Sequence, residues 1–376
     1  MNRLFTNRHT GVLIRVAFVF FMTFVITGCT GEEKTVTEGV TSPAAAGADI
    51  YENSLVNSAV SFEHELDDYV PKKTEYNFYF TYKLVHPWWD AVAMGLEDAA
   101  EQFEDKGITI NYEYLAPNAV DAKDQAQRIR SASKRGFDVI GVDVADSAVI
   151  APVINQVMKG GQKVITFSSS DTAESDNCDR IAYVGNTHNY QDGADLAEAL
   201  CARIGYKGKI GIIVGDPGAP CHEERLAGAK DVIKKYKDVK IIGVDYDRES
   251  ADRAEKIADR FIEKEPDLSG IICCNMVNPV GAAHSVISHR LTDKITIVGM
   301  DHDERALRLL HEGMIYCLGV QDCCSIGFDT MQVAVKVADG LKPGSEYQKF
   351  TNEKTTLIYQ KDAKAMMYKL YGQELK

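Results

Sequence analysis

The 376-residue sequence lacks an excess of positive charge and lacks an N-terminal apolar run long enough to span a membrane. Lysine and arginine number 42 against 55 aspartates and glutamates, so the formal net charge is −13 at pH 7. A chain this acidic is a poor partner for nucleic acid. The apolar run Val16–Ile26 has 11 residues, too few to cross a bilayer as a helix. We therefore expect neither a nucleic-acid partner nor a membrane-spanning helix in this segment.

The cysteines lack the spacing of a zinc site. Cys29 stands apart, and none of the other eight shows the two-residue spacing that zinc ligands have. These eight are Cys178, Cys201, Cys221, Cys273, Cys274, Cys317, Cys323 and Cys324. Three of them fall in predicted strands, where a free cysteine behaves as a small apolar residue. We predict structural thiols and no bound metal, with a disulfide somewhere among the eight as the open alternative.

Motifs of enzymatic chemistry are also missing. The segment Gly215–Gly218 precedes a helix but lacks the Gly-Lys-Ser/Thr ending of a phosphate-binding loop. Cys221, His222 and Glu223 have the chemistry of nucleophile, base and orienting residue. Neighbours on one helix diverge, however, whereas catalytic triads are assembled from separate elements. We therefore predict a protein that is not an enzyme and uses no cofactor.

The first 28 residues are typical of a targeting segment. A basic start is followed by the apolar run, which ends in Ile26-Thr27-Gly28-Cys29. This ending resembles the bacterial lipobox, whose cysteine is lipidated and becomes the new N-terminus. The resemblance implies a lipoprotein signal peptide over 1–28, a lipid anchor on Cys29 and a bacterial cell-envelope location on the extracytoplasmic side of the membrane. An uncleaved N-terminal anchor is the alternative. Residues 29–73 are predicted to form a flexible tether.

From Tyr76 onward, predicted strands and helices alternate. The strand Tyr76–Tyr82 is followed by a helix with apolar residues at i, i+3, i+4 and i+7 spacing, and the alternation restarts at the strand Ile181–Val184. Repeated strand–helix units predict parallel sheets with helices on both faces. Two such halves in tandem predict two lobes around a ligand cleft.

The stretch Ser269–Asp301 is the clearest of these units. Its two predicted strands end in Asn275 and Asp301, and in open α/β sheets ligands bind at the carboxyl ends of strands. An amide and a carboxylate at these ends suit a polyhydroxylated ligand because they can donate and accept hydrogen bonds. The alternative is that both residues cap the helices that follow.

Several short motifs, taken in order, resemble the type I periplasmic binding proteins, specifically the ribose/galactose-like sugar-binding group. They are His86-Pro87-Trp88-Trp89 after the first strand, Gln125 with Arg135-Gly136-Phe137-Asp138, Ile272-Cys273-Cys274-Asn275, Val298-Gly299-Met300-Asp301, and Gln321 after a later strand. The resemblance runs from about Tyr76 to Tyr359.

The resemblance implies an α/β fold of two Rossmann-like lobes with parallel sheets, joined by a three-segment hinge, with the ligand cleft between them. The crossings are expected near Val184–Thr187, Val320–Cys323 and Phe350–Lys354. The N-terminal lobe would comprise residues 74–185 and 322–350, and the C-terminal lobe residues 186–321 and 351–376.

The same resemblance implies a function. Proteins of this group close by a hinge movement on a sugar and then dock on a membrane permease. We expect a lipid-anchored, monomeric solute-binding protein that delivers a sugar or polyol to an ABC transporter. The alternative is a ligand sensor of the same fold for a membrane receptor or histidine kinase.

Ligand contacts are implied at the positions that match the family's motifs. Trp88 and Trp89 offer flat surfaces for sugar rings, and since adjacent helix positions point about 100° apart, one of them can face the core instead. Polar contacts are expected from Asn275, Asp301 and Gln321, and a further aromatic contact from Tyr246.

The sequence departs from the family pattern in three places. His86 stands where the family has asparagine, and Ser168-Ser169 replace an acid and a base after the fourth strand, which speaks against ribose. The family's ligand-binding arginine falls on Arg225 in one alignment register, whereas the other register places Glu223 there. A pocket containing Glu223 and Asp301 would favour a neutral or cationic ligand.

Overall fold

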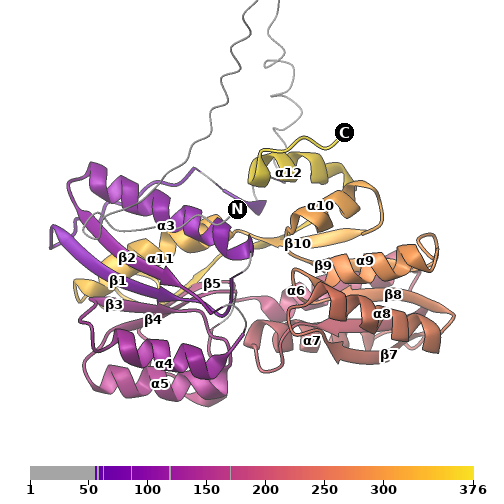
Figure 1. Ribbon diagram of the computed structural model, residues 1–376, viewed down its shortest axis with the longest axis horizontal. Coiled ribbons are helices and arrows are strands. Elements are labelled where there is room, and N and C mark those ends of the chain that lie inside the picture. Colours follow the sequence, from indigo (N-terminus) through magenta and orange to yellow (C-terminus); the bar gives the residue numbers. More distant parts are fainter. Residues whose placement is uncertain (1–55, 57–58, 62, 86, 118–119, 170) are drawn as a thin grey trace, which may run out of the picture. The chain divides into compact units, whose positions relative to one another are not determined.

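The computed structural model describes residues 56, 59–61, 63–85, 87–117, 120–169 and 171–376, which form two α/β lobes (Figure 1). The predicted signal peptide, the predicted lipidation site Cys29 and the tether as far as residue 55 lie outside the described residues. Within the described part of the chain, no helix combines the length and the apolar character that crossing a bilayer demands.

The first lobe contains a six-stranded sheet whose strands are all parallel. In spatial order its strands are β11 (Phe350–Asn352), β5 (Tyr183–Gly185), β4 (Val164–Ser168), β3 (Val139–Val142), β1 (Glu75–Thr81) and β2 (Thr109–Leu115). Every residue of β3 and β4 is buried, as expected for central strands with helices on both faces.

The second lobe repeats this architecture with one difference. Its strands in spatial order are β12 (Thr355–Tyr359), β10 (Cys317–Gln321), β9 (Thr296–Met300), β8 (Leu268–Cys273), β6 (Gly208–Val214) and β7 (Val239–Tyr246). The edge strand β12 runs antiparallel to β10, whereas the other pairs are parallel. The predicted class, two lobes with parallel sheets, is confirmed, and β12 is its antiparallel edge.

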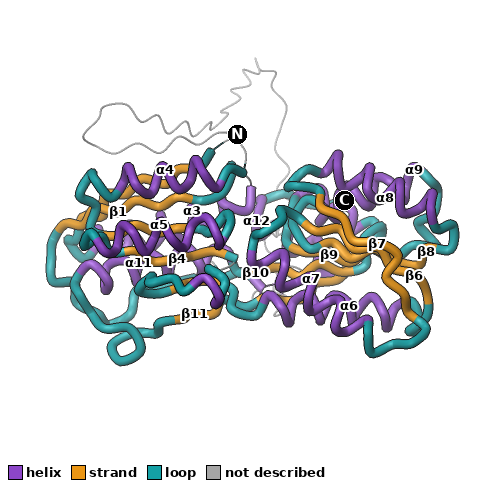
Figure 2. The backbone as a smooth tube through the Cα atoms, turned by 90° about the horizontal axis from the view of Figure 1, so that it is seen from below, coloured by secondary structure: helices purple, strands orange, loops and turns teal. Residues whose placement is uncertain are grey.

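Helices cover both faces of each sheet. In the first lobe these are α3 (Pro87–Asp105), α4 (Ala122–Ala132), α5 (Ser147–Lys159) and α11 (Cys323–Ala338). In the second they are α6 (Asn189–Arg203), α7 (Pro220–Ile233), α8 (Ala251–Lys264), α9 (Asn278–Ser288), α10 (Glu304–His311) and α12 (Ala363–Tyr371). Short 3₁₀ turns occupy Glu174–Asp176 and Gln360–Asp362. Figure 2 shows the second sheet between α6 and α7 on one side and α8 and α9 on the other.

Glycine pairs bring helix backbones into direct contact in both lobes. A Cβ atom added at Gly95 of α3 would overlap the carbonyl of Cys324, and one at Gly327 of α11 would overlap the α3 backbone. Gly193 of α6 and Gly228 of α7 form the same interlock in the second lobe. Because any larger residue would separate the helices, these positions fix the packing of each pair.

The described chain passes between the two sheets three times. The crossings follow β5 at residues 186–188, β10 at residue 322 and β11 at residues 353–354. They are linked to one another, since Glu353 N–H donates to Gly185 O at 3.0 Å and Asp322 N–H donates to Lys354 O at 3.3 Å. The three crossings therefore form one compact hinge.

The segment before β1 lies along α11. Ser61 N–H donates to Asp322 Oδ2 at 3.0 Å, Asp67 N–H to Gln332 Oε1 at 3.0 Å, and Lys72 N–H to Asp339 Oδ2 at 2.8 Å. These acceptors span α11 from its first turn to its last. This part of the predicted tether is therefore held against the first lobe, starting at the hinge.

The hinge should make stability depend on pH through Glu353. Burial, the charge of Asp329 and a hydrogen bond with that carboxyl raise the pKa of Glu353 to about 8. The folded chain keeps this proton where an unfolded chain has lost it, so the free energy of unfolding should fall as pH rises from about 4.5 to about 8. Glu353→Gln should remove this fall, which amounts to a few kcal/mol at most since one pKa unit is about 1.4 kcal/mol.

Urea unfolding at several pH values across this window measures the effect. The exposed carboxyl Glu312 supplies the control, because Glu312→Gln should leave the slope of stability against pH as in the parent. Equal slopes in the parent and in Glu353→Gln would show that the carboxyl pair does not hold a shared proton.

Candidate ligand-binding site

A small cavity lies where the carboxyl ends of strands from both sheets meet. The first lobe contributes residues that follow β1 and β4 together with the first turn of α3, and the second lobe contributes residues at or after the ends of β7, β8, β9 and β10 together with α7. The lining residues are Lys83, Leu84, Trp88, Trp89, Ser169, His222, Arg225, Glu249, Asn275, Met276, Asp301 and Gln321. This is the position at which open α/β sheets bind ligands.

Six of the predicted contact residues line this cavity. They are Trp88, Trp89, Arg225, Asn275, Asp301 and Gln321. Both tryptophans reach the cavity, although Trp89 also packs in an aromatic cluster with Tyr82, Trp88 and Phe167, with ring centroids 4.8, 4.5 and 6.1 Å away. The first turn of α3 therefore presents two adjacent rings to one space.

Of the other four predicted residues, three are placed elsewhere. His86 lies outside the described residues. Ser168 is buried beneath the cavity, where its hydroxyl donates to Asp143 Oδ1 at 2.5 Å, and its neighbour Ser169 lines the cavity instead. Glu223 accepts a hydrogen bond from Tyr246 Oη at 3.1 Å, and neither of these two residues is among those that line the cavity.

The start of α7 decides between Arg225 and Glu223. The sequence pattern predicts a helix from Glu223, whereas α7 begins at Pro220, a favoured first helical residue. This start places Arg225 on the buried face, with 1% of its surface exposed. The structure therefore puts a guanidinium, and not the Glu223 carboxylate, in the cavity wall.

Sequence reasoning missed several lining residues, most importantly Lys83 and Glu249. Each lies two or three residues beyond the end of its strand, in a loop whose path no residue pattern indicates. Glu249 and Arg248 have positive φ angles of 59° and 53°, which fold the chain after β7 back toward the cavity. Among the missed lining residues, Ser169 could have been predicted from the sequence, because it is one of the two serines that replace the family's charged pair.

Asp301 joins the lobes at the cavity. Its Oδ1 accepts hydrogen bonds from Trp88 Nε1 of the first lobe at 3.2 Å and from Gln321 Nε2 at 2.7 Å. Its backbone has φ 66°, a left-handed conformation that aspartate and asparagine adopt more readily than most residues. The carboxylate thus lies at the meeting point of α3, β9 and β10.

Two of the N–H-bearing nitrogens of Arg225 have no hydrogen-bond acceptor among the described residues. Its Nη1 donates to Cys274 O at 3.1 Å, whereas Nε and Nη2 are buried and have no hydrogen-bond partner among the described residues. A buried donor without a partner costs about 1–3 kcal/mol, and more when the group is charged. A ligand oxygen placed here would recover this free energy.

Asn275, by contrast, already uses its full hydrogen-bonding capacity. Its Nδ2 donates to Asp247 Oδ1 at 3.2 Å and to Glu249 Oε2 at 2.8 Å, and its Oδ1 accepts from the backbone N–H groups of Val277 and Asn278 at 3.1 and 2.9 Å. In this arrangement Asn275 holds Glu249 in place at the cavity wall.

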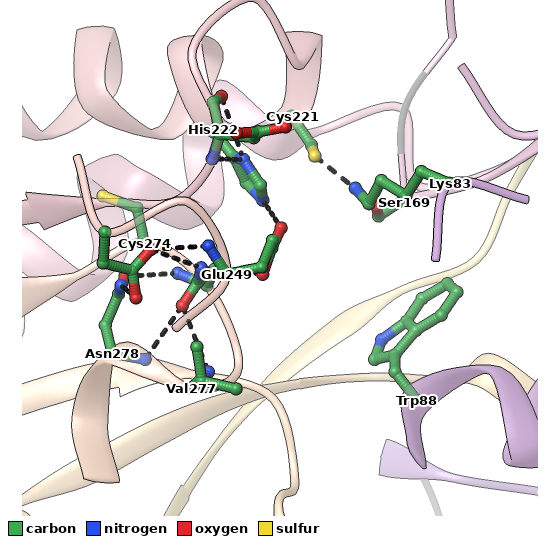
Figure 3. Close-up of polar contacts among 12 residues, drawn as sticks. Lys83, Trp88, Ser169, Cys221, His222, Glu249, Cys274, Val277 and Asn278 are labelled. Carbon is green, nitrogen blue, oxygen red and sulfur yellow. Dashed lines mark hydrogen bonds and ion pairs between the residues drawn. The ribbon is translucent and has the colours of Figure 1, made fainter. Parts of the chain in front are cut away.

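Charged groups from both lobes face each other across the cavity. Figure 3 shows Lys83 and Trp88 approaching from the first lobe, opposite His222 and Glu249 of the second. The His222 ring joins Asp216 N, at 2.9 Å from Nδ1, to Glu249 Oε1, at 3.3 Å from Nε2. Burial opposes the charge of Lys83, but Cys221, Asp143 and Glu249 together raise its pKa. Lys83 is therefore a buried cation.

The cavity is small. Its volume is about 30 Å³, room for a few water molecules and much less than a monosaccharide occupies. A sugar-sized ligand could enter only if the lobes part or the long side chains of Lys83 and Arg225 turn aside. The hinge supplies the first route.

Comparisons with known proteins agree with this architecture. Residues 78–342 match the family described as periplasmic binding protein domain. The D-allose-binding periplasmic protein of Escherichia coli K12 is 24% identical over 262 residues, which cover 67% of this chain and 81% of that protein.

Solved structures show the same fold at low sequence identity. GanP, a glucose-galactose binding protein from Geobacillus stearothermophilus, superposes with a TM-score of 0.70 at 23% identity, covering 77% of this chain and 99% of that one. The XylFII-LytSN complex contains a chain that superposes with a TM-score of 0.68 at 22% identity, covering 77% and 100%. With the family match extending over most of its length and both lobes in place, the chain belongs to the periplasmic binding protein family.

Proposed function

We propose that this chain captures a sugar or related polyol between its lobes and delivers it to the permease of an ABC transporter. The observation that carries the proposal is the hydrogen bond between Trp88 and Asp301, because it joins the two lobes inside a cavity that also holds the unpartnered N–H groups of Arg225. A polyhydroxylated ligand can accept from Arg225, donate to Asp301 and pack on the tryptophan rings at the same time.

The charges around the cavity favour a ligand without net charge. Both signs of charge line the cavity, with Lys83 and Arg225 opposite Glu249 and Asp301, and with the His222 ring against Glu249. A neutral ligand rich in hydroxyl groups matches this balance, since each hydroxyl both donates and accepts. The D-allose-binding relative is consistent with a monosaccharide.

We further propose that the protein is anchored in the cell envelope and contacts a permease there. Cys29 in its lipobox-like context would anchor the mature, monomeric chain at the extracytoplasmic side of the membrane. The permease would recognise the closed form of the two lobes. The protein itself would carry out no reaction and need no cofactor.

A sensing role is the second candidate. The structural similarity to a chain of the XylFII-LytSN complex favours it, because that complex joins two different proteins. In this role the closed lobes would dock on a membrane receptor instead of a permease. Identifying the proteins that co-purify with the ligand-bound chain from its native membrane would separate the two roles.

Mass spectrometry of small molecules released from the purified, denatured mature protein tests the ligand class. We expect a monosaccharide or polyol, and adding it back at about 100 times its Kd should stabilise the fold by about 2.7 kcal/mol. Release of a peptide, an amino acid or a nucleoside would contradict the sugar assignment while leaving the fold unaffected. Absence of any released molecule, together with no stabilisation by a broad panel of sugars and polyols, would also contradict it.

A further inference from the structure

Asn186 joins the two lobes at the first crossing of the hinge. Its backbone is held by the first lobe, because its N–H donates to Ser168 O at 3.2 Å and its carbonyl accepts from Tyr183 Oη at 2.8 Å. Its side chain instead enters the second lobe, where it contacts Asp192 of α6 and Thr355 of β12. The residue is buried. A rotation of one lobe against the other would therefore change the contacts of this side chain.

The amide group of Asn186 has more acceptors than it can serve. Its Oδ1 accepts from the backbone N–H of His188 at 2.7 Å, so its NH₂ group points the other way, into the second lobe. Four acceptors lie around Nδ2, at 2.5 Å for Asp192 Oδ2, 3.1 Å for Thr355 Oγ1, 3.2 Å for Asn189 Oδ1 and 3.4 Å for Gln321 Oε1. Since the group has only two hydrogens, the most distant contact is the one that a small rotation most readily makes or breaks.

That most distant acceptor leads to the ligand cavity. The Oε1 of Gln321 faces Asn186, and its Nε2 donates to Asp301 Oδ1 at 2.7 Å. The same oxygen of Asp301 accepts from Trp88 Nε1 of the first lobe. Hydrogen bonds that are linked in a buried chain strengthen one another. The amide of Gln321 is therefore a direct link between the first crossing and the carboxylate at which the lobes meet.

The third crossing takes part in the same network. The hydroxyl of Thr355 donates to Asp192 Oδ2 at 2.9 Å, and Thr355 pairs in register with Gln321 across β10 and β12. Thr187 N–H, in the first crossing, donates to Asn352 Oδ1 of β11 at 2.9 Å. The first crossing thus contacts residues that flank both of the others.

We propose that Asn186 is a positioning residue that couples closure of the lobes to the ligand cavity. In the closed form its NH₂ group orients the amide of Gln321. That amide in turn holds the Asp301 carboxylate beside Trp88, ready for the ligand. The inference rests on the proposed function, although Asn186 is not among the residues that line the cavity. Because coupling of this kind is reciprocal, ligand binding would favour the closed hinge to the same extent.

Asn186→Asp tests the coupling without changing the shape of the side chain. The new carboxyl group would face Asp192 Oδ2, which lies 2.5 Å from Nδ2. Two carboxyl groups this close share one proton at low pH and repel each other when both ionise. The contact should therefore persist at about pH 5 and break by about pH 8. The other titratable groups around the pair are unchanged from the parent, and they are Tyr183, His188, Glu224, Arg225, Asp301 and Glu353.

Tryptophan fluorescence reports on the contact between the lobes without any ligand. Trp88 and Trp89 are the only tryptophans in the chain, and Trp88 loses its contact with Asp301 if the lobes part. In Asn186→Asp the emission should move to longer wavelength between about pH 5 and about pH 8, whereas the parent should show no such shift. The affinity of Asn186→Asp for the ligand released from the parent should fall at least about tenfold relative to the parent over the same range, because one pKa unit corresponds to a factor of ten.

Two further variants control the experiment. Asn155 of α5 also accepts a backbone N–H, from Asp179 at 2.7 Å, and donates to Asn177 O at 2.9 Å, so Asn155→Asp should keep the parent's emission at every pH. Combining Asn186→Asp with Asp192→Asn exchanges amide and carboxylate and restores a single charge, and this double variant should lose the pH-dependent shift.

The outcomes separate this inference from the proposed function. Failure to find a sugar or polyol would contradict the function, while the fluorescence measurement still tests the coupling. Parent-like emission at every pH in a folded Asn186→Asp, or an equal shift in Asn155→Asp, would overturn the inference. If Asn186→Asp unfolds at high pH, Asn186→Ala takes its place. Its emission should then lie at longer wavelength at every pH, and a spectrum like that of the parent would again overturn the inference.

Discussion

Asp301→Asn should lose ligand binding while it keeps the unliganded fold. Asparagine has the same shape as aspartate and tolerates the left-handed backbone of this position, whereas alanine at φ 66° would add strain. The substitution removes a negative charge that interacts with Arg225 and one of the acceptors in the cavity. Hydrogen bonds to charged groups contribute about 1.5–3 kcal/mol, so affinity should fall about 10- to 150-fold.

Isothermal titration with the ligand released from the parent protein measures this loss. Asp303 provides a matched control two residues away, since its side chain caps α10 and pairs with Arg305 at 2.7 Å. Asp303→Asn should lower thermal stability slightly through the weaker cap and leave affinity unchanged. Parent-like affinity in Asp301→Asn would mean that the carboxylate only supports Trp88 and Gln321.

Arg225→Met should reduce affinity even more and yet leave the unliganded protein about as stable as the parent. A neutral ligand would lose two hydrogen bonds to a charged group, each of which contributes about 1.5–3 kcal/mol, so Kd should rise at least about 100-fold. Methionine fills a similar volume without two buried, unpartnered nitrogens, and this gain should offset the loss of a cation near Asp192 and Asp301. The substitution should therefore weaken ligand binding without lowering the melting temperature of the unliganded protein.

Thermal unfolding without ligand, combined with titration of the ligand, tests this separation. The exposed Arg203 of α6 serves as the control, and Arg203→Met should change neither quantity by much. If Arg225→Met instead melts far below the parent and binds ligand normally, Arg225 is a structural residue of α7.

The sequence predicted the architecture because its strongest signals are local. Alternating apolar strands and amphipathic helices require parallel sheets, and Asn275 and Asp301 follow β8 and β9 by two residues and one residue. Trp88 and Trp89 were found in the same way, as the first turn of a helix after a strand. Each of these inferences needs only the residue pattern within one strand–helix unit.

Other parts of the site depend on features that no short pattern encodes. Whether Arg225 or Glu223 faces the cavity depends on a helix start that differs by three residues from the predicted one. Glu249 reaches the cavity through two consecutive residues with positive φ, which neither has a strong preference to adopt. Lys83 has counter-charges both in its own lobe, at Asp143, and in the opposite lobe, at Glu249, and this is a tertiary effect.

The glycine interlocks have a mechanical consequence. Where backbones touch, as at Gly95 with α11 and Gly193 with α7, two helices cannot slide past each other, so shear within a lobe is suppressed. Each lobe then turns as a stiff lever about the hinge. A small rotation about the hinge brings Asp301 to Trp88. The same rotation moves the outer edges of the lobes farther, because they lie farther from the hinge. A partner protein that contacts both outer edges would thus respond to a displacement larger than the one at the ligand.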